Sequence, residues 1–174
     1  MSVAKPLESA VFWALIDTAG PPALDRGPRA GVQAASVLVK AVSPALAALS
    51  PTGRAAALGL AHLWHDDLDA AHGQCQAHED DADCNYVHAL LHRREGDFAN
   101  AKYWFREVGS HPVQVAVAAA ASARGLGQLL IDGNWDPAAG VDACARALRG
   151  GDPAPLIVLQ AAEFRALAAH LFSP

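Results

Sequence analysis

The sequence has few aromatic residues, few charged residues and no alternating strand pattern. Aromatic residues make up 6% of its 174 residues and charged residues 18%, whereas hydrophobic residues make up 52%. No segment alternates Val, Ile or Thr with polar residues, which argues against a β-sheet protein. The core must therefore be built largely from Ala and Leu side chains. The length is typical of one domain, and we expect a single all-α domain over residues 1–174.

The chain also lacks an excess of basic residues and a long uncharged hydrophobic run. Its formal net charge is −5, without a basic patch, which argues against nucleic-acid binding. No membrane helix is expected, because no apolar segment reaches the roughly 18 uncharged residues that a span needs. The N-terminus does not look like a signal peptide, since Lys5 is followed by Pro6 and Glu8. We therefore predict a cytoplasmic protein that binds neither nucleic acid nor membrane.

Cysteine is scarce, and no catalytic motif is present. The three cysteines, Cys75, Cys84 and Cys144, are an odd number without metal-type spacing. We expect buried or half-buried free thiols of a cytoplasmic protein. The sequence has no phosphate-binding glycine loop and no Gly-x-Ser-x-Gly turn. Because these motifs are absent, we expect neither an enzymatic activity nor a cofactor on this ground.

The acidic loop over residues 78–83 offers oxygen ligands for a cation. It lacks the glycine and the terminal glutamate of a helix-loop-helix calcium site. We expect a solvated connector in which Asp83 caps the helix that follows.

The middle of the chain has the pattern of a helical hairpin. Apolar residues at helical spacing predict one helix over 83–95 and another over 98–108. Gly96 can take the left-handed conformation that ends a helix, and Asp97 supplies a capping oxygen for the next one. Pro112 closes the unit, because the residue before a proline resists the helical region. A connection this short makes the two helices antiparallel.

The spacing of small and aromatic residues in this hairpin resembles a tetratricopeptide repeat. The residues that carry the resemblance are Ala89, Gly96, Asp97, Phe98, Ala101, Phe105 and Pro112. Asn85 departs from the pattern, because it stands where a large residue is usual. A second copy covers about 52–79, and a third, poorer hairpin combines helices over 114–131 and 138–148. The resemblance covers Thr52 to Arg149 and implies a right-handed superhelix of antiparallel helix hairpins.

Helices outside the repeats are expected to cap the array, because terminal helices must cover an otherwise exposed hydrophobic face. We expect N-terminal capping helices within 1–50, two to three repeats over 52–149, and a C-terminal capping helix over 153–172. The segment 31–42 is apolar almost all round and predicts a buried helix that Ser43-Pro44 ends. The sequence does not decide whether the chain forms a homodimer through a capping helix.

The resemblance implies a binding module that holds a protein segment in the concave groove lined by the first helices of the repeats. The expected binding residues are Tyr86, His88, His92, Arg93, Arg94, Asn100 and Trp104. Two adjacent arginines can grip a carboxylate or phosphate through paired hydrogen bonds. We expect a protein or peptide partner with an acidic or carboxylate end, or another anionic ligand. Alternatively, the arginines lie on a solvated face and pair with acids along the helix.

A second hypothesis is a metal or small-molecule site, with hydrolytic activity as an option. It would be built from the histidines of two adjacent first helices and one carboxylate: His62, His65, His88, His92 and Glu95. Neutral imidazoles and a carboxylate suit zinc or another divalent transition metal. In a third interpretation the same residues are structural and form hydrogen bonds only with each other.

Overall fold

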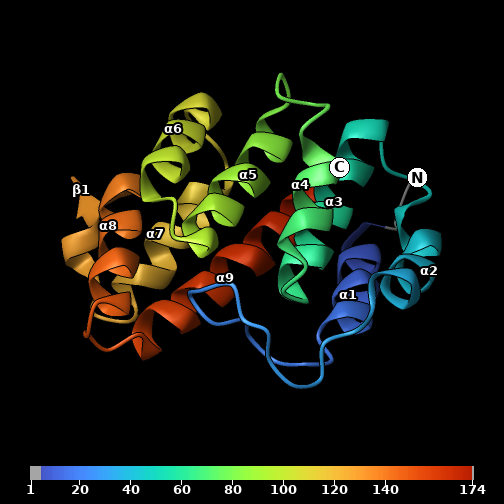
Figure 1. Cartoon of the computed structure of the whole chain (residues 1–174). Helices are drawn as coiled ribbons and strands as arrows, with labels where there is room; N and C mark the ends of the chain where they lie inside the picture. The colour runs from blue at the N-terminus through green and yellow to red at the C-terminus, as the bar shows by residue number, and fades with distance from the viewer. Residues whose placement is uncertain (1–4, 174) are drawn as a thin grey trace.

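The computed structural model describes residues 5–173, which are mostly α-helical (Figure 1). The helices are α1 (Lys5–Ile16), α2 (Ala35–Leu46), α3 (Pro51–Trp64), α4 (Leu68–Cys75), α5 (Ala82–Glu95), α6 (Phe98–Val108), α7 (Val113–Ser122), α8 (Pro137–Leu148) and α9 (Ala154–Leu171). A 3-10 turn, Gly127–Leu129, precedes two short antiparallel strands, β1 (Leu130–Ile131) and β2 (Asn134–Trp135). The predicted all-α class is confirmed. Residues 1–4 and Pro174, which the prediction included in the domain, lie outside the described residues.

The central hairpin has the predicted helices and turn. α5 ends at Gly96, whose φ is 83°, and Asp97 caps α6 by accepting from the backbone N–H of Asn100 at 3.1 Å. The prediction that Asp83 caps α5 is wrong. Asp81 is the cap, and its side chain accepts from the backbone N–H groups of residues 83 and 84 at 3.0 and 3.1 Å. The carboxylate of Asp83 is therefore not used as a helix cap.

The second helices of the neighbouring hairpins begin with the same kind of cap. Asp67 accepts from the N–H of Ala70 at 3.1 Å at the start of α4. Asp136 accepts from the N–H of Ala138 at 3.0 Å, with Pro137 in the first turn of α8 as predicted. These short polar caps let helices begin directly after tight turns.

The structure corrects the prediction for the second helix. α2 begins at Ala35, and Gly31, where the prediction began it, has a left-handed φ of 83°. Pro44 lies inside α2 rather than ending it. Proline has no amide N–H, so the carbonyl of Lys40 lacks the hydrogen bond that residue 44 would otherwise donate to it. α2 is buried on one side only, and Val37 on the other side is 57% exposed.

The Ala-rich helix α7 is shorter than predicted. It ends at Ser122, and Gly125, with a φ of 70°, lies just beyond its end. Residues 130 and 131, predicted as helix, pair with β2 across Asp132 and Gly133. Positive φ values of 50° and 80° at these two residues are those of a type I′ turn, for which Asp-Gly is a favoured sequence.

The helices pack as antiparallel pairs, α3 with α4 and α5 with α6, and α5 also packs on both helices of the preceding pair. Beyond this, α6 packs on α8, whereas α7 packs on α9 and β2. The C-terminal helix α9 runs along the array and packs on α1, α3 and α7 (Figure 1). It covers the side formed by the first helices of the pairs rather than the end of the array.

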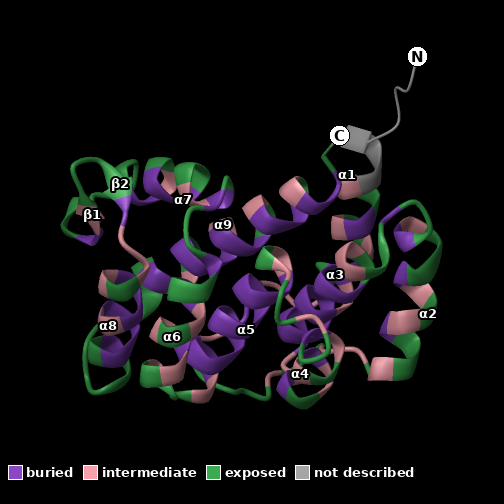
Figure 2. Cartoon of the chain, turned by 90° about the horizontal axis from the view of Figure 1, so that it is seen from above, coloured by how far each residue is buried: buried purple, intermediate pink, exposed green. Residues whose placement is uncertain are grey.

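Helix α5 is buried on every side. Each residue from Cys84 to Arg94 is buried, and Figure 2 shows this helix in the middle of the molecule. A helix inside a protein is usually apolar all round, but α5 carries two histidines and two arginines among its buried residues. Because buried polar groups need hydrogen-bond partners, these side chains must find theirs within the protein.

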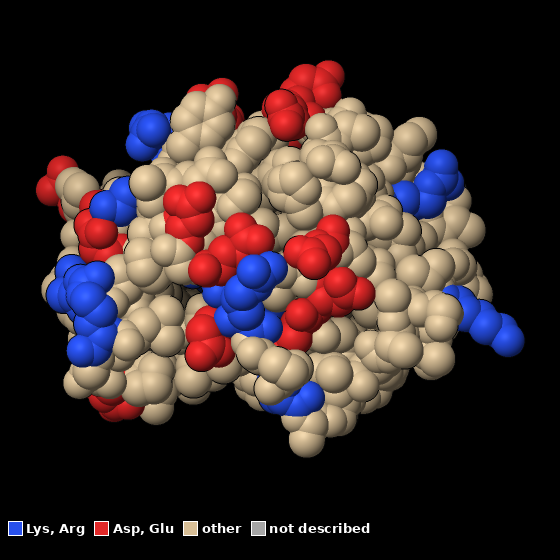
Figure 3. Space-filling view, in the orientation of Figure 1, with Lys and Arg blue, Asp and Glu red and all other residues tan. Residues whose placement is uncertain are grey.

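The surface of the described residues carries both kinds of charge. On the face seen in Figure 3, acidic side chains gather around a few basic ones, and no basic patch extends across it. Among residues 5–173, no helix combines the length and the apolar character that crossing a membrane would require.

Candidate functional site

Tyr86 and Arg93, two predicted groove residues, hold a carboxylate that belongs to the chain itself. The Tyr86 hydroxyl donates to Oε1 of Glu163 at 2.8 Å, and Nη2 of Arg93 donates to Oε2 at 2.7 Å. Burial, and secondly Glu163, raise the pKa of Tyr86. Burial lowers the pKa of Arg93, but Glu163, with Cys144 and Tyr86, raises it overall. The expected carboxylate contact is thus made within the molecule, by α9.

Arg94 is occupied by a second internal network. It donates to Oδ1 of Asp66 at 2.7 Å and to the carbonyl of Asp25 at 2.9 Å, and also to the carbonyl of Leu63. Asp66 also pairs with Arg29, at 3.3 Å. Arg94 therefore ties the loop after α1 to the end of α3, and its buried guanidinium is not open to a ligand.

The remaining predicted residues lie between α5 and α6. Nδ1 of His92 is 2.9 Å from Oε2 of Glu95, and its Nε2 is 3.2 Å from the amide nitrogen of Asn100. His88 packs against Trp104, with ring centroids 4.4 Å apart, and neither of its nitrogens has a partner. Burial, followed by His72 and His92, lowers the pKa of His88 to about 4. This imidazole is therefore neutral at pH 7.

The five residues of the metal hypothesis do not converge, and His88 has no hydrogen-bond partner at all. His62 lies 3.9 Å from Asp67, and His65 accepts from the backbone N–H of Gln33 at 3.1 Å. His92 is paired with Glu95. Among the described residues, no three of the five present ligand atoms within 4.8 Å of one another. A metal at this set requires its side chains to move, and the hypothesis stays a prediction.

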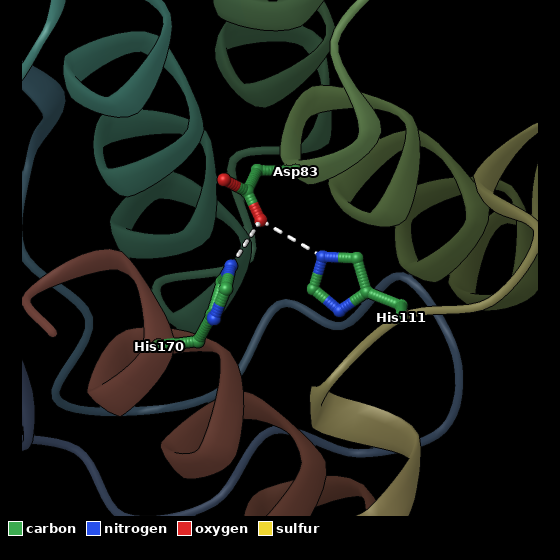
Figure 4. A group of neighbouring side chains, drawn as sticks. All are labelled: Asp83, His111 and His170. Carbon is green, nitrogen blue, oxygen red and sulfur yellow. Dashed lines mark hydrogen bonds and ion pairs between the residues drawn. The ribbon is translucent and has the colours of Figure 1, made fainter.

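A different group converges in the structure: Asp83, His111 and His170 (Figure 4). Oδ1 of Asp83 lies 2.9 Å from Nε2 of His111 and 3.2 Å from Nε2 of His170. The two imidazole rings have centroids 4.8 Å apart. We call these three residues the Asp83 triad. They come from the first turn of α5, the connection before α7, and the last turn of α9.

The local sequence places the triad. Because Asp81 caps α5, the carboxylate of Asp83 is left to contact the two histidines. Nδ1 of His111 accepts from the backbone N–H of Val113 at 3.3 Å, which aims Nε2 at Asp83. Sequence reasoning missed the triad because it assigned Asp83 to a cap and set aside His170, the one histidine outside the 62–111 region. The sequence did offer one signal: both Asp81 and Asp83 lie at the start of α5, and only one of them is needed as a helix cap.

A pocket of about 440 Å³ lies between α7 and the β1–β2 hairpin, and we call it the α7 pocket. It is lined by Ser110, His111, Gln114, Val115, Ala118, Ala119, Ser122, Leu130, Gly133, Asn134 and Trp135. The α7 residues recur at helical spacing and so form one face of the helix. No Asp, Glu, Lys or Arg lines the pocket. The indole N–H of Trp135 is buried and has no hydrogen-bond partner.

Comparison of the chain with protein-family models, with curated proteins and with solved structures gives no match. The function must therefore be argued from the chemistry of these sites.

Proposed function

We propose that this chain is a ligand-binding protein built on helical hairpins, and that its ligand enters the α7 pocket. We expect a ligand that joins a compact apolar body to a carbonyl or carboxylate oxygen. The observation that carries the proposal is the pocket itself, whose lining includes Trp135, a residue with a buried and unpartnered indole N–H.

The position of α9 favours this pocket over the groove expected from the resemblance. Glu163 of α9 already occupies Tyr86 and Arg93, and both residues are buried. A partner segment in that groove would have to displace α9 and leave Arg93 without its counter-charge. The α7 pocket needs no such rearrangement. A protein segment would enter the α7 pocket by its carboxylate end. The ligand chemistry is then the one predicted from the sequence, but the binding site is a different one.

The size and lining of the pocket fit a small ligand. Its volume of about 440 Å³ lies within the roughly 300–1,000 Å³ typical of small-molecule sites. Ala118 and Ala119 leave room for the ligand body, and Leu130 offers apolar contact. The hydroxyls of Ser110 and Ser122 can donate to an oxygen, and no lining carboxylate repels an anion.

The unpartnered donor gives the pocket a preference for acceptors. A buried N–H without a partner costs about 1–3 kcal/mol. A ligand oxygen that reaches Trp135 recovers this cost, whereas an apolar ligand of the same shape does not. Acceptor-bearing ligands should therefore bind more tightly than their hydrocarbon analogues.

The test follows the indole N–H signal of Trp135 by ¹⁵N NMR, with Trp135→Phe identifying that signal among those of four tryptophans. The probes are small aliphatic and aromatic carboxylic acids, the matched primary amides, and short peptides with free or amidated C-termini. We expect acids or amides to shift the signal in a saturable way. Free-ended peptides will do so only if the natural ligand is a protein terminus.

Two substitutions on α7 provide the matched control. Ala119 is exposed and lines the pocket, so Ala119→Trp should fill the pocket and abolish the shift. Ala116 is exposed on the same helix but does not line the pocket, so Ala116→Trp should bind as wild type does. Equal binding by both variants, or no shift with any probe, would contradict the proposal.

A further inference from the structure

We infer that the Asp83 triad is a zinc site with three protein ligands and one open position. Three ligand atoms from distant parts of the chain converge on one point, Oδ1 of Asp83 and Nε2 of His111 and His170 (Figure 4). All three lie within 4.8 Å of one another. The inference rests on this cluster alone and does not depend on a ligand in the α7 pocket.

The distances are close to those of a tetrahedral site. Zinc bonds of about 2.0–2.2 Å place neighbouring ligand atoms roughly 3.4 Å apart. In the triad, Asp83 lies 2.9 Å from His111 and 3.2 Å from His170. Small outward movements of the side chains therefore make room for the ion. Two imidazoles and one carboxylate are a ligand set that zinc uses with water as its fourth ligand.

The triad is reachable from solvent and lies in a mostly acidic neighbourhood. The side chains of Asp83 and His170 are 24% and 34% exposed, whereas that of His111 is 3% exposed. Residues 79–81, just before Asp83, are all acidic and raise the local cation concentration. The C-terminus of α9 at His170 favours positive charge, while the N-terminus of α5 at Asp83 opposes it.

Zinc binding requires the proton of His111 to change place. In the metal-free triad His111 accepts at Nδ1 from the N–H of Val113, so its own proton lies on Nε2 and points at Asp83. Zinc at Nε2 moves the remaining proton to Nδ1, and the Val113 hydrogen bond is lost. That bond is long, at 3.3 Å. Three metal–ligand bonds replace it, together with the hydrogen bond of His111 and the ion-pair contact of His170 with Asp83.

The Asp83 triad differs from the histidine set predicted from the sequence because its ligand atoms already lie close together. The triad needs small shifts of residues that already meet, whereas the ligand atoms of the predicted set do not converge among the described residues. That set is His62, His65, His88, His92 and Glu95. One experiment can distinguish the two sets, because no residue is shared.

The test is calorimetric titration of zinc into untagged, metal-free protein, above the ordinary pKa of histidine, followed by elemental analysis after washing. We expect about one zinc per chain for wild type. Asp83→Asn and His170→Ala should each bind zinc at least roughly 100-fold more weakly, because second-shell changes alone cost 10- to 100-fold. His78→Ala, a loop histidine outside the triad, should bind as wild type does.

Melting curves of the metal-free variants show whether each one folds. His170 is the more exposed histidine, so His170→Ala is the variant least dependent on folding effects. No zinc on wild-type protein, or unchanged affinity in folded His170→Ala, would overturn the inference. Loss of zinc in His92→Ala with normal binding in His170→Ala would also overturn it, and would favour the predicted histidine set.

Discussion

Arg93 of α5 and Glu163 of α9 form an ion pair of 2.7 Å whose side chains are only 3% and 1% exposed. The Tyr86 hydroxyl donates to the other carboxylate oxygen at 2.8 Å. A buried pair of this kind pays a desolvation cost that the partners recover only together. This ion pair thus holds α9 against α5, and removing either charge alone should destabilise the protein.

Replacing Glu163 by Ala should destabilise the protein strongly. It leaves the Arg93 guanidinium buried without a counter-charge, which typically costs about 3–5 kcal/mol. Urea unfolding followed by circular dichroism measures the change. Asp142→Ala is the control, because Asp142 pairs with Lys102 at 2.6 Å with side chains that are 49% and 31% exposed. Exposed pairs contribute up to about 1 kcal/mol.

A double substitution separates the pair from the packing around it. Arg93→Met with Glu163→Leu removes both charges and should recover much of the lost stability, as apolar replacements of buried pairs often do. If Glu163→Ala costs no more than Asp142→Ala, the ion pair does not hold α9 in place.

Gly140→Ala should destabilise the protein although alanine favours helices. A Cβ at this position in α8 would lie 2.5 Å from Cζ2 of Trp135, so the indole ring must move. Overpacking of this kind costs about 1–3 kcal/mol. Gly73→Ala is the matched control, since nothing lies within 4 Å of its added Cβ in α4. It should stabilise by roughly 0.5–1 kcal/mol, and thermal unfolding would compare the two.

Movement of the Trp135 ring gives Gly140→Ala a second readout. Trp135 lines the α7 pocket, so its indole NMR signal should shift in Gly140→Ala and stay in place in Gly73→Ala. A Gly140→Ala protein with wild-type stability and an unchanged indole signal would show that the ring does not pack this closely.

Stability should fall on acidification because of His88. The unfolded chain takes up a proton at this imidazole near its ordinary pKa of 6.5, whereas in the folded protein the pKa is about 4. Unfolding therefore becomes easier between pH 6.5 and 4, while above pH 6.5 this contribution to stability is fully present. The expected loss is roughly 2–3 kcal/mol. Urea unfolding at several pH values would measure it.

His88→Leu isolates this contribution. Leucine cannot titrate, so the pH dependence of unfolding should be weaker than in wild type over this window. His78→Ala serves as the control, because His78 lies in the loop before α5. His62 and His65 have pKa values lowered chiefly by burial and add a dependence of the same sign in every variant. An unchanged slope in His88→Leu would contradict the assignment.

The three thiols should be unreactive in the folded protein. Cys75, Cys84 and Cys144 are buried and free. The pKa of Cys75 is raised by its hydrogen bond with Cys84 and by burial, and that of Cys144 is raised by burial. Because the thiolate is the reactive form, a thiol reagent such as DTNB should react only at the rate of unfolding. Rapid reaction of one thiol without denaturant would contradict this.

The local architecture of the central hairpin could be predicted from the sequence. Gly96 and Asp97 determine the turn by their own backbone and side-chain chemistry, so a short window suffices. The boundaries of α2 and α7 were harder to predict from the sequence. Pro44 lies inside α2, although a proline usually marks the end of a helix, and residues 130–131 form a strand because of a turn that follows them.

The sites depend on contacts between residues far apart in sequence. Arg93 was predicted to bind the carboxylate of a partner, whereas in the structure it pairs with Glu163, which lies 70 residues away on a helix expected to cap the end of the array. In the triad, Asp83 meets His111 and His170 only because α9 lies along the helix pairs. Helical periodicity fixes which face of α9 is apolar, but not which surface it covers.

The path of α9 also joins the two ends of the chain. Phe172 packs on Phe12 with ring centroids 5.1 Å apart, and Arg165 pairs with Asp17 at 2.8 Å. In an open repeat protein each unit touches only its neighbours, so units can be added, removed or unfolded one at a time. Here the last helix touches the first, which closes the row of helices into a ring of contacts. Such a molecule should unfold as one cooperative unit.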